Sequence, residues 1–302
     1  ASLATFLAIY FLRPFAVNID LLDIPSKRKQ HEGSIPLVGG IAMFFGIIFS
    51  ILLGPIDLNS FKYFLTAALI LIIVGVIDDY SGMQVSYRLV FQIIAALIIV
   101  TMGDVSITSL GNLLGNGEIY LNKWSLLLSV FAIVAGINAV NMADGIHGLA
   151  GGNSLISFMA ISFLSINSSL QDSLLISLLF CAVLPVFLIH NLCIGISSSK
   201  RIFMGDAGSI LIGVSLVWVL FDFSQGDDRS FSPVIALWLF ALPLIEIAST
   251  VLRRLISGVS PFKPDSHHSH HLLLKLGFSE KKTLILILMF STFMAIIGVL
   301  GE

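Results

Sequence analysis

Two adjacent acids, Asp78 and Asp79, directly follow an apolar run in the motif GVIDDY. One acid at the end of an apolar helix is ordinary, because such an end meets water. Two acids side by side are different, since their like charges raise the pKa of one carboxyl group. Two adjacent carboxylates suit the binding of a divalent cation, or of a phosphate held through one. By itself, the pair is a weak signal of phosphate chemistry.

A second motif, NAVNMADGIHGLAGG, repeats a polar residue at every third position, at Asn138, Asn141, Asp144 and His147. Three-residue steps bring neighbouring side chains close together on a helix or a tight turn. Asn and Asp oxygens suit a hard cation such as Mg²⁺, and they also read the polar edge of a base. For the glycines of this motif, the alternative is close helix packing through small residues, which is common in membranes.

A third motif, SKRIFMGDAGS, places Asp206 between two glycines just before an apolar run, with Arg201 upstream. The acid is either an ordinary N-cap, which satisfies the free amides of a helix, or a metal ligand. A helix N-terminus also attracts anions, so a carboxylate, Mg²⁺ and phosphates can share that place. Arg88, ten residues after Asp78, either anchors a helix at the membrane surface or clamps a phosphate.

Four of the seven histidines fall within five residues of the segment PFKPDSHHSHHLL, at His267, His268, His270 and His271. A zinc site would normally add thiolates, or a separated histidine pair with an acid. Neither Cys181 nor Cys193 is near in the sequence. Beside Lys263, the imidazoles suit phosphate oxygens better than zinc.

The elements that must position these motifs are dominated by apolar residues. The hydrophobic fraction is 57% and the charged fraction 11%, with a mean hydropathy of +1.00, which excludes an ordinary water-soluble domain. The apolar runs approach the ~20 residues that a helix needs to cross a bilayer. They are continuous rather than alternating, which favours helices over a β-barrel. We predict an all-α polytopic membrane protein of about ten transmembrane helices, at residues 2–16, 37–54, 61–77, 88–103, 124–141, 150–166, 173–191, 208–222, 232–251 and 283–300.

The basic residues predict how these helices are oriented. With alternate crossings, only Lys62, Lys123 and Arg229 of the 16 Lys and Arg residues fall on one face. The opposite face, which carries all of the polar motifs, is therefore predicted to be cytoplasmic. We treat residues 1–302 as one integral-membrane domain. We expect further sequence at one or both ends, because the chain begins within an apolar run and stops directly after another.

The two cysteines and one acid that lie within or next to the apolar runs allow further predictions. Cys181 and Cys193 fall on one predicted helix, about 18 Å apart at 1.5 Å per residue, so they cannot form a disulfide with each other. Glu246 lies inside the predicted helix at residues 232–251. An intramembrane acid is a candidate functional residue, but we favour a buried ion pair with a neighbouring helix.

Acids, amides, basic residues and histidines on one membrane face fit Mg²⁺-assisted phosphoryl transfer. The main alternative is an ion-coupled transporter or a lipid-binding membrane protein. A transporter fits less well, because its polar groups would gather near the bilayer midplane, between broken helices.

Five motifs in this order resemble those of the polyprenyl-phosphate N-acetylhexosamine-1-phosphate transferases, most closely the WecA-type branch: IPLVGGIAMFFG, GVIDDY, NAVNMADGIHGLAGG, FMGDAGSILIG and SPFKPDSHHSHH. The resemblance covers essentially the whole chain. It implies a fold that usually has eleven transmembrane helices, with the active-site loops on the cytoplasmic face of the bacterial inner membrane.

The same resemblance implies the reaction and its partners. N-acetylhexosamine-1-phosphate, with GlcNAc as the favoured sugar, would pass from a UDP-sugar to undecaprenyl phosphate, with release of UMP. This would be the first membrane step of a cell-surface polysaccharide, and another UDP-sugar stays an alternative. We expect Mg²⁺, or Mn²⁺, as cofactor. The expected partners are undecaprenyl phosphate, the UDP-N-acetylhexosamine, the lipid bilayer and a second copy in a homodimer, and we expect no nucleic acid.

Residue roles follow from the resemblance only. Asp206 would bind Mg²⁺, with Asn141 as a second ligand or a close neighbour. The proposed catalytic set is Asp78 and Asp79, which would orient or deprotonate the lipid phosphate, together with Asp144 and His268. The row from Asp144 to His147 would face the uridine and its phosphates. Further substrate contacts are expected from Arg88, Asn138, His147, Arg201, His270 and His271.

The sequence departs from the family pattern at three positions. His147 stands where the family has Asp or Asn, Ser266 where it usually has Lys or Arg, and Glu246 where this branch usually has Asp.

Overall fold

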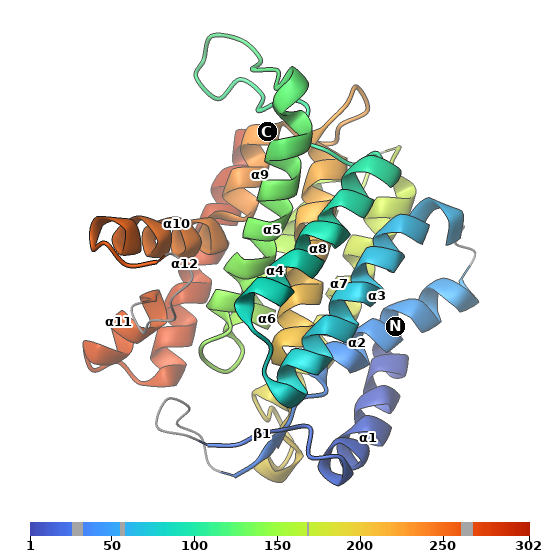
Figure 1. Cartoon of the computed structure of the whole chain (residues 1–302), viewed down its shortest axis with the longest axis vertical. Helices are drawn as coiled ribbons and strands as arrows, with labels where there is room; N and C mark the ends of the chain where they lie inside the picture. Colours follow the sequence, from blue (N-terminus) through green and yellow to red (C-terminus); the bar gives the residue numbers. More distant parts are fainter. Residues whose placement is uncertain (26–32, 55–57, 168, 261–267) are drawn as a thin grey trace.

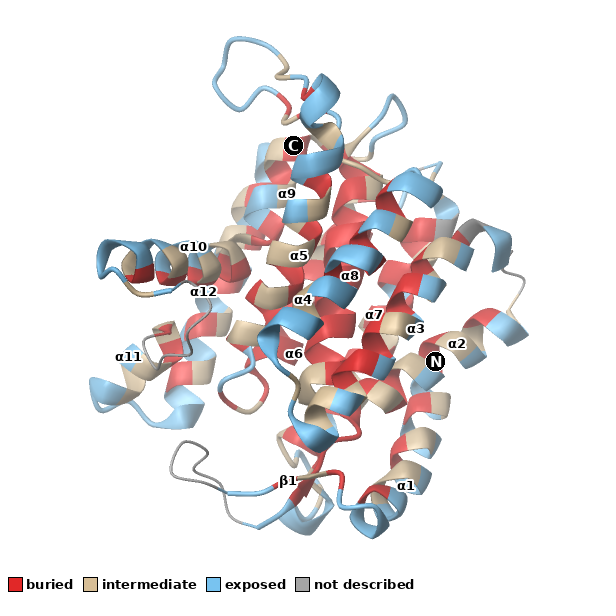
Figure 2. Cartoon of the chain, viewed as in Figure 1, coloured by how far each residue is buried: buried red, intermediate tan, exposed pale blue. Residues whose placement is uncertain are grey.

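A single central helix, α8 (Gly205–Ser224), organises the fold (Figure 1). The computed structural model describes residues 1–25, 33–54, 58–167, 169–260 and 268–302. Within it, 94% of the residues in the apolar stretch of α8 are buried, as expected for a helix that has apolar residues on all sides between the acids near its two ends. Figure 2 shows this burial as a red core along α8. The helices that pack around it are α2 (Gly39–Leu53), α3 (Leu58–Ser81), α5 (Ser125–Ala143), α6 (Leu149–Leu164) and α7 (Gln171–Asn191).

The remaining helices pack on the outside of this group. α1 (Ser2–Asn18) contacts α2 and α7, and α4 (Val85–Leu97) contacts α3 and α5. α12 (Glu280–Gly301) lies against α6 and α9 (Pro233–Leu239). α10 (Ala241–Ile256) extends sideways from the bundle, with the short α11 (Ser269–Lys275) below it in the view of Figure 1. Three short turns complete the helical elements: the π-helical η1 (Ile98–Met102) and the 3₁₀ turns η2 (Asn122–Trp124) and η3 (Ser198–Lys200).

The helical, membrane-type architecture agrees with the sequence prediction. Among the described residues, six helices are long and apolar enough to cross a membrane, or seven if the bent pair α9 and α10 forms one span. The apolar helices α1, α2 and α6 are shorter. Large apolar side chains also face outwards, as at Leu53, Phe163 and Leu300, whose exposed fractions are 73%, 68% and 80%. A surface of this kind suits contact with lipid.

The single helix predicted at residues 232–251 is wrong. The structure bends by 80° between α9 and α10, at Phe240. Pro243 explains the break, because a proline has no N–H and its ring clashes with the carbonyl group four residues earlier. That carbonyl belongs to Leu239, the last residue of α9. Glu246 therefore lies on a separate helix that leaves the bundle.

The cysteines also differ in part from prediction. α7 ends at Asn191, so Cys193 lies beyond the helix, with a positive φ of 56°. Both cysteines are free, as predicted.

A small two-stranded sheet, absent from the sequence prediction, precedes α2. β1 (Leu22–Asp23) pairs antiparallel with β2 (Ile35–Pro36). The chain after β2 then binds the segment before α8: the Phe203 N–H donates to the Pro36 carbonyl, and the Gly40 N–H donates to the Met204 carbonyl at 3.0 Å. A Cβ at Gly40 would collide with the backbone of α8, so glycine is needed for this approach. These bonds hold the start of α8 in place.

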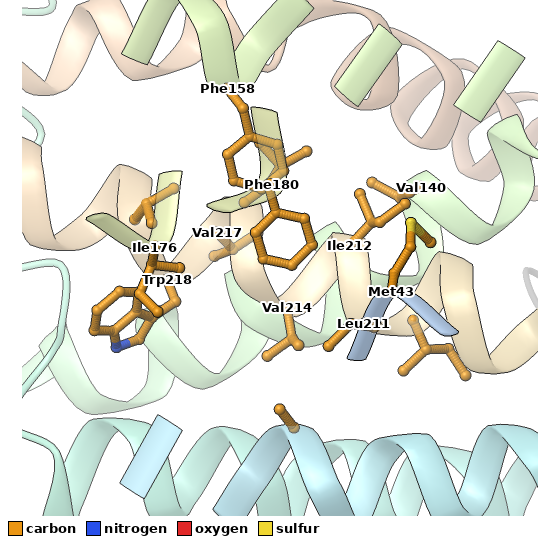
Figure 3. Close-up of a cluster of buried hydrophobic side chains, with 14 of the residues drawn as sticks. Met43, Val140, Phe158, Ile176, Phe180, Leu211, Ile212, Val214, Val217 and Trp218 are labelled. Atoms are coloured by element: carbon orange, nitrogen blue, oxygen red, sulfur yellow. The ribbon is translucent and has the colours of Figure 1, made fainter. Parts of the chain in front are cut away.

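The core beneath the site is a close-packed cluster of apolar side chains from α2, α5, α6, α7 and α8 (Figure 3). Phe158 and Phe180 stack with ring centroids 4.5 Å apart and planes at 5°. Dense packing of this kind resists movement, so the helix ends that carry the polar motifs have a rigid base.

Candidate active site

Asp79 lies near the end of α3 but caps a different helix. Its two carboxylate oxygens accept hydrogen bonds from the Asp206 and Ala207 backbone N–H groups, at 2.7 and 3.2 Å. The first N–H groups of a helix have no partner within it, so a carboxylate placed there stabilises the helix. Gly205 has a φ of +72°, and a Cβ at this position would collide with Asp79. Glycine is thus needed where α8 begins.

Asp206 is not the N-cap of α8, which corrects one of the two interpretations of this residue. The N-cap position is Met204, and the capping carboxylate comes from Asp79. The Asp206 side chain instead accepts a hydrogen bond from the Asn141 amide at 2.5 Å. The same amide donates to the Ser209 hydroxyl at 2.9 Å. Asn141 is therefore a close neighbour of Asp206, as one of the two expectations had it.

Arg88 lies between two of the acids. Its Nη1 is 2.9 Å from Asp78 Oδ2 and 3.9 Å from Asp206 Oδ2. The other oxygen of Asp78 accepts from the Met83 N–H at 2.7 Å, which closes the turn after α3. The structure thus brings Asp78 and Asp206 to one guanidinium group, and Asp79 joins them through its hydrogen bond to the Asp206 backbone. We call these three acids with Arg88 and Asn141 the acid cluster.

The acid cluster suits a magnesium ion chemically. Two carboxylates, those of Asp78 and Asp206, face one guanidinium group, so when both are ionised the cluster has excess negative charge, which a divalent cation would offset. Among the described residues, no three His, Cys, Asp or Glu side chains form a ready-made metal cage. Mg²⁺ does not require such a cage, because it keeps several waters and binds one or two carboxylates together with substrate phosphates.

The polar row of the second motif does not form one surface, contrary to expectation. Asn138 donates to Gln92 Oε1 on α4 at 2.6 Å, and Gln92 is fully buried. Asn141 instead faces the acid cluster. α5 ends at Ala143, so Asp144 and His147 lie in the loop that follows. Two glycines favour this loop, and Gly148 has a φ of +79°.

Asp144 lies at the mouth of the site. Its backbone N–H bonds to the Asn141 carbonyl at 3.3 Å, at the end of α5. The residue is exposed at the surface, but the protein packed around its carboxyl group partly desolvates it and raises the pKa of the carboxyl to about 7. The negative charges of Asp206 and Asp23 add to this rise. Near neutral pH, Asp144 can therefore either donate or accept a proton.

His147 packs against Phe203, with ring centroids 5.0 Å apart. Phe203 belongs to the segment that leads into α8. The structure thus places His147 beside the strand-like entry to the acid cluster. Its expected contact with a nucleotide stays a prediction.

Glu246 holds the start of the segment that carries His268, His270 and His271, which we call the histidine segment. One of its oxygens accepts from the Ser269 N–H at 3.0 Å, at the start of α11, and the other lies 3.3 Å from His268 Nδ1. Glu246 is 4% exposed and His268 8%. We predicted a buried ion pair between Glu246 and a neighbouring helix; the structure shows a buried contact with His268, the N-cap residue of α11, which is an ion pair only when that histidine is protonated. The sequence did not reveal that the partner of Glu246 is a histidine of the motif SPFKPDSHHSHH.

His270 connects this segment to the loop after α5. It is 1% exposed, and neither ring nitrogen has a hydrogen-bond partner among the described residues. Its ring lies so close to Gly145 that a Cβ there would collide with it. Burial lowers the pKa of His270 to about 4, with a further lowering from His271 and His268. His270 is thus a neutral imidazole against Gly145, in the loop that also carries Asp144.

Other predicted residues lie elsewhere or cannot be placed. Arg201 donates from Nε to Cys193 Sγ at 3.3 Å, and no described contact joins it to the acid cluster. His271 lies beside His270, with ring centroids 4.1 Å apart. Lys263, Asp265, Ser266 and His267 lie outside the described residues.

Sequence reasoning missed three supporting residues. Gln92 holds Asn138, Ser209 holds Asn141, and Gly205 allows Asp79 to approach α8. Only Gly205 carried a local signal, since it precedes an acid at the start of an apolar run. The other two depend on contacts between distant helices.

Comparisons with known proteins agree with this arrangement. Residues 61–224 match the family described as glycosyl transferase family 4. The chain is 38% identical over 303 residues to the undecaprenyl-phosphate alpha-N-acetylglucosaminyl 1-phosphate transferase of Escherichia coli K12, across 99% of this chain and 82% of the relative. The proteins of that name from Yersinia pestis and Haemophilus influenzae are 37% and 38% identical. Those two alignments cover 97% and 99% of this chain, and 80% and 84% of the relatives.

Proposed function

From the premise that this chain belongs to glycosyl transferase family 4, as its motifs predicted, we propose that it transfers GlcNAc-1-phosphate to undecaprenyl phosphate. The observation that carries the proposal is the convergence of Asp78, Asp79 and Asp206 at the start of α8. Relatives named undecaprenyl-phosphate alpha-N-acetylglucosaminyl 1-phosphate transferase align with nearly the whole chain, which supports the same activity here.

The proposed reaction uses UDP-GlcNAc as donor. An oxygen of the lipid phosphate forms a bond to the β-phosphorus of the donor. The bond from that phosphorus to the bridging oxygen breaks, and UMP leaves with the electron pair. The second pKa of a phosphate monoester is about 6, so the lipid phosphate is largely dianionic at pH 7 and needs little help from a base. Catalysis then consists mainly of positioning and charge neutralisation.

The acid cluster divides into two proposed roles. Asp79 uses both oxygens to hold the first turn of α8, so we assign it to positioning Asp206. Asp206 and Asp78 would hold Mg²⁺, or Mn²⁺ in its place, with Asn141 orienting Asp206 through its amide. When bound, the metal would neutralise the phosphate charges of the donor. Arg88 is already held between these acids, from where it would contact a phosphate oxygen.

The histidine segment would bind the other part of the donor. His270 is neutral, and its ring nitrogens are available for a sugar hydroxyl or a pyrophosphate oxygen. His268, held by Glu246, and His271 would complete this wall. Asp144 lies next to it and would contact the uridine side of the donor, together with His147. Arg201 stays a phosphate candidate without support from a contact.

We also propose the finer topology from the sequence. Counting α1, α2 and α6 together with the longer helices and the bent pair would make ten spans. The acid cluster and the histidine segment would lie on the cytoplasmic face of the bacterial inner membrane, as the basic residues predict. A homodimer and another UDP-sugar as donor remain part of this proposal only through family resemblance.

The test is UMP release by the detergent-purified protein with undecaprenyl phosphate and UDP-GlcNAc. We expect release that depends on the lipid and is abolished by EDTA and by Asp206→Asn. The matched control is Asp222→Asn, which changes the same residue type at the other end of α8 and should keep the activity. UDP-GalNAc in parallel identifies the sugar. Solute transport without UMP from any UDP-sugar would instead favour the transporter alternative.

A further inference from the structure

A polar cavity lies at the end of α8 opposite the acid cluster. It has a volume of about 430 Å³ and lies among the start of α3, the end of η1, the start of α7 and the end of α8. The residues that matter below are Phe61, Phe64, Ser173, Trp218 and Asp222. Asp222 follows Asp206 by 16 residues on α8, which is about 24 Å at 1.5 Å per residue. The cavity is therefore separate from the acid cluster.

Asp222 has no charged partner among the described residues. Within the part of the chain that the structure describes, its one hydrogen bond comes from the hydroxyl group of Ser173, on α7. It also lies in the last turn of α8, where the helix dipole disfavours a carboxylate. A neutral asparagine would accept the same hydrogen bond without this electrostatic cost. When it is ionised, the Asp222 carboxyl therefore has no counter-charge among the described residues.

Aromatic rings form the wall next to this acid. The Trp218 ring lies 4.7 Å from that of Phe64 and 6.0 Å from that of Phe61, between centroids. Figure 3 shows the Trp218 indole at one end of the buried apolar cluster. Aromatic faces attract cations, tryptophan most strongly. A carboxylate beside aromatic faces is the combination that recognises an organic ammonium group. A bare Ca²⁺ would need six or more oxygen ligands instead.

Lys62 indicates which ammonium compound fits. It belongs to the same turn of α3 as Phe61, and its ammonium group lies 4.8 Å from the centroid of the Tyr63 ring, which also lines the cavity. The positive charge of Lys62 would pair with the phosphodiester group of a ligand bound in the cavity. The volume lies within the range of about 300–1,000 Å³ that is typical of small-ligand sites.

We propose that this cavity binds the head group of an ethanolamine phospholipid, with the ammonium group at Asp222 and Trp218 and the phosphate near Lys62. The site would sense the lipid composition at the end of the bundle opposite the acid cluster. The same ammonium chemistry could be supplied by a soluble amine, so the test separates the two sources.

The experiment uses Trp218 as its own reporter. The chain has three tryptophans, so Trp124→Phe with Trp238→Phe leaves only Trp218. This protein is titrated in detergent with short-chain phosphatidylethanolamine and with its N-acetyl derivative, which lacks the positive charge. We expect a saturable fluorescence change, with the N-acetyl lipid binding about fivefold to tenfold more weakly, as one cation contact predicts. Asp222→Asn should remove this difference.

Glu118→Gln changes an acid that is ion-paired with Arg229, 2.7 Å away, and should leave the lipid preference intact. Equal affinity for the two lipids, or a preference that persists in Asp222→Asn, would overturn the proposal. Saturation by ethanolamine or spermidine alone would keep the ammonium site but overturn the lipid as its source.

Folding of the Asp222→Asn protein is checked separately by its thermal unfolding. If that variant is unfolded, the comparison of the two lipids on the unsubstituted Asp222 protein decides. Because this readout does not involve a UDP-sugar, it is independent of the proposed transferase activity.

Discussion

At the residue scale, two neighbouring acids of the same chemical type have different tasks because of what each one touches. Asp79 is bonded to the backbone of α8, whereas Asp78 and Asp206 face Arg88. The sequence motif treats Asp78 and Asp79 as a pair. In the structure Asp79 bonds to the backbone of α8 and Asp78 to Arg88, and we therefore propose a positioning role for Asp79 and a metal-binding role for Asp78.

Substitution of these acids should separate stability from activity. Asp79→Ala removes the cap of α8, so we expect a loss of about 1 kcal/mol or more in unfolding free energy, together with loss of UMP release. Asp206→Asn keeps the hydrogen bond with Asn141 through its carbonyl and removes a like charge, so activity should fall without a lower melting temperature. Thermal unfolding and UMP release, measured on both proteins, test this. A destabilised Asp206→Asn protein with an unaffected Asp79→Ala protein would contradict it.

His270 and Asp144 should give the stability opposite dependences on pH. The pKa of His270 is lowered to about 4 in the folded state, so the unfolded chain binds the proton more tightly. Its stabilising effect is present above pH 6.5 and is lost as the pH falls towards 4, by about 1.4 kcal/mol per pH unit. The pKa of Asp144 is raised to about 7, so the folded state binds that proton more tightly and loses stability as the pH rises from about 4 to 7.

Single substitutions should therefore change the pH profile in opposite directions. Between pH 7 and pH 5, the melting temperature should fall less in His270→Gln than in the unsubstituted protein. In Asp144→Asn it should fall more, because protonation of Asp144 no longer offsets the loss. Measurements are made in EDTA so that metal binding does not contribute. Parallel profiles for all three proteins would show that neither group titrates as described.

At the element scale, the break between α9 and α10 decides where the histidine segment lies. α10 leaves the bundle at Phe240 and carries Glu246 to the start of α11. The bend and the buried acid together fix His268 near the loop that carries Asp144. A straight helix would have kept Glu246 within the bundle, far from the histidines.

Glu246 should act as a positioning residue for His268. Glu246→Gln can still accept from the Ser269 N–H, but its neutral side chain no longer favours the Nδ1-protonated form of His268. We expect kcat to fall about tenfold or more with little change in melting temperature, and the pH profile of kcat to shift. Glu246→Asp, the residue usual in this branch, should restore part of the activity. An unchanged pH profile would assign Glu246 a purely structural role.

At the scale of the whole molecule, the residues of the proposed reaction lie at one end of the bundle, and the cavity lined by Asp222 and Trp218 lies at the other. α8 connects the two, since Asp206 and Asp222 are on its first and last turns. A rigid, buried central helix keeps these ends apart. Their separation also allows a direct test of orientation.

The predicted orientation can be tested by labelling cysteines. In a background of Cys181→Ser and Cys193→Ser, single cysteines are introduced by Ser198→Cys and Asn116→Cys, both at exposed positions. A membrane-impermeant maleimide should label Asn116→Cys in intact cells and Ser198→Cys only after permeabilisation. The reverse pattern would show that the acid cluster faces the cell exterior.

Hydropathy determined the helical membrane class, and the resemblance of five motifs to a known family indicated the family and most of the residues that gather at the site. These features are local, because an apolar run of sufficient length and a short motif need no distant contact to be recognised. The tertiary structure decided which acid caps α8, that Asn138 faces Gln92 rather than the site, and that Glu246 holds His268. Each of these depends on two segments that lie 22 to 127 residues apart in the chain and meet only when the helices pack.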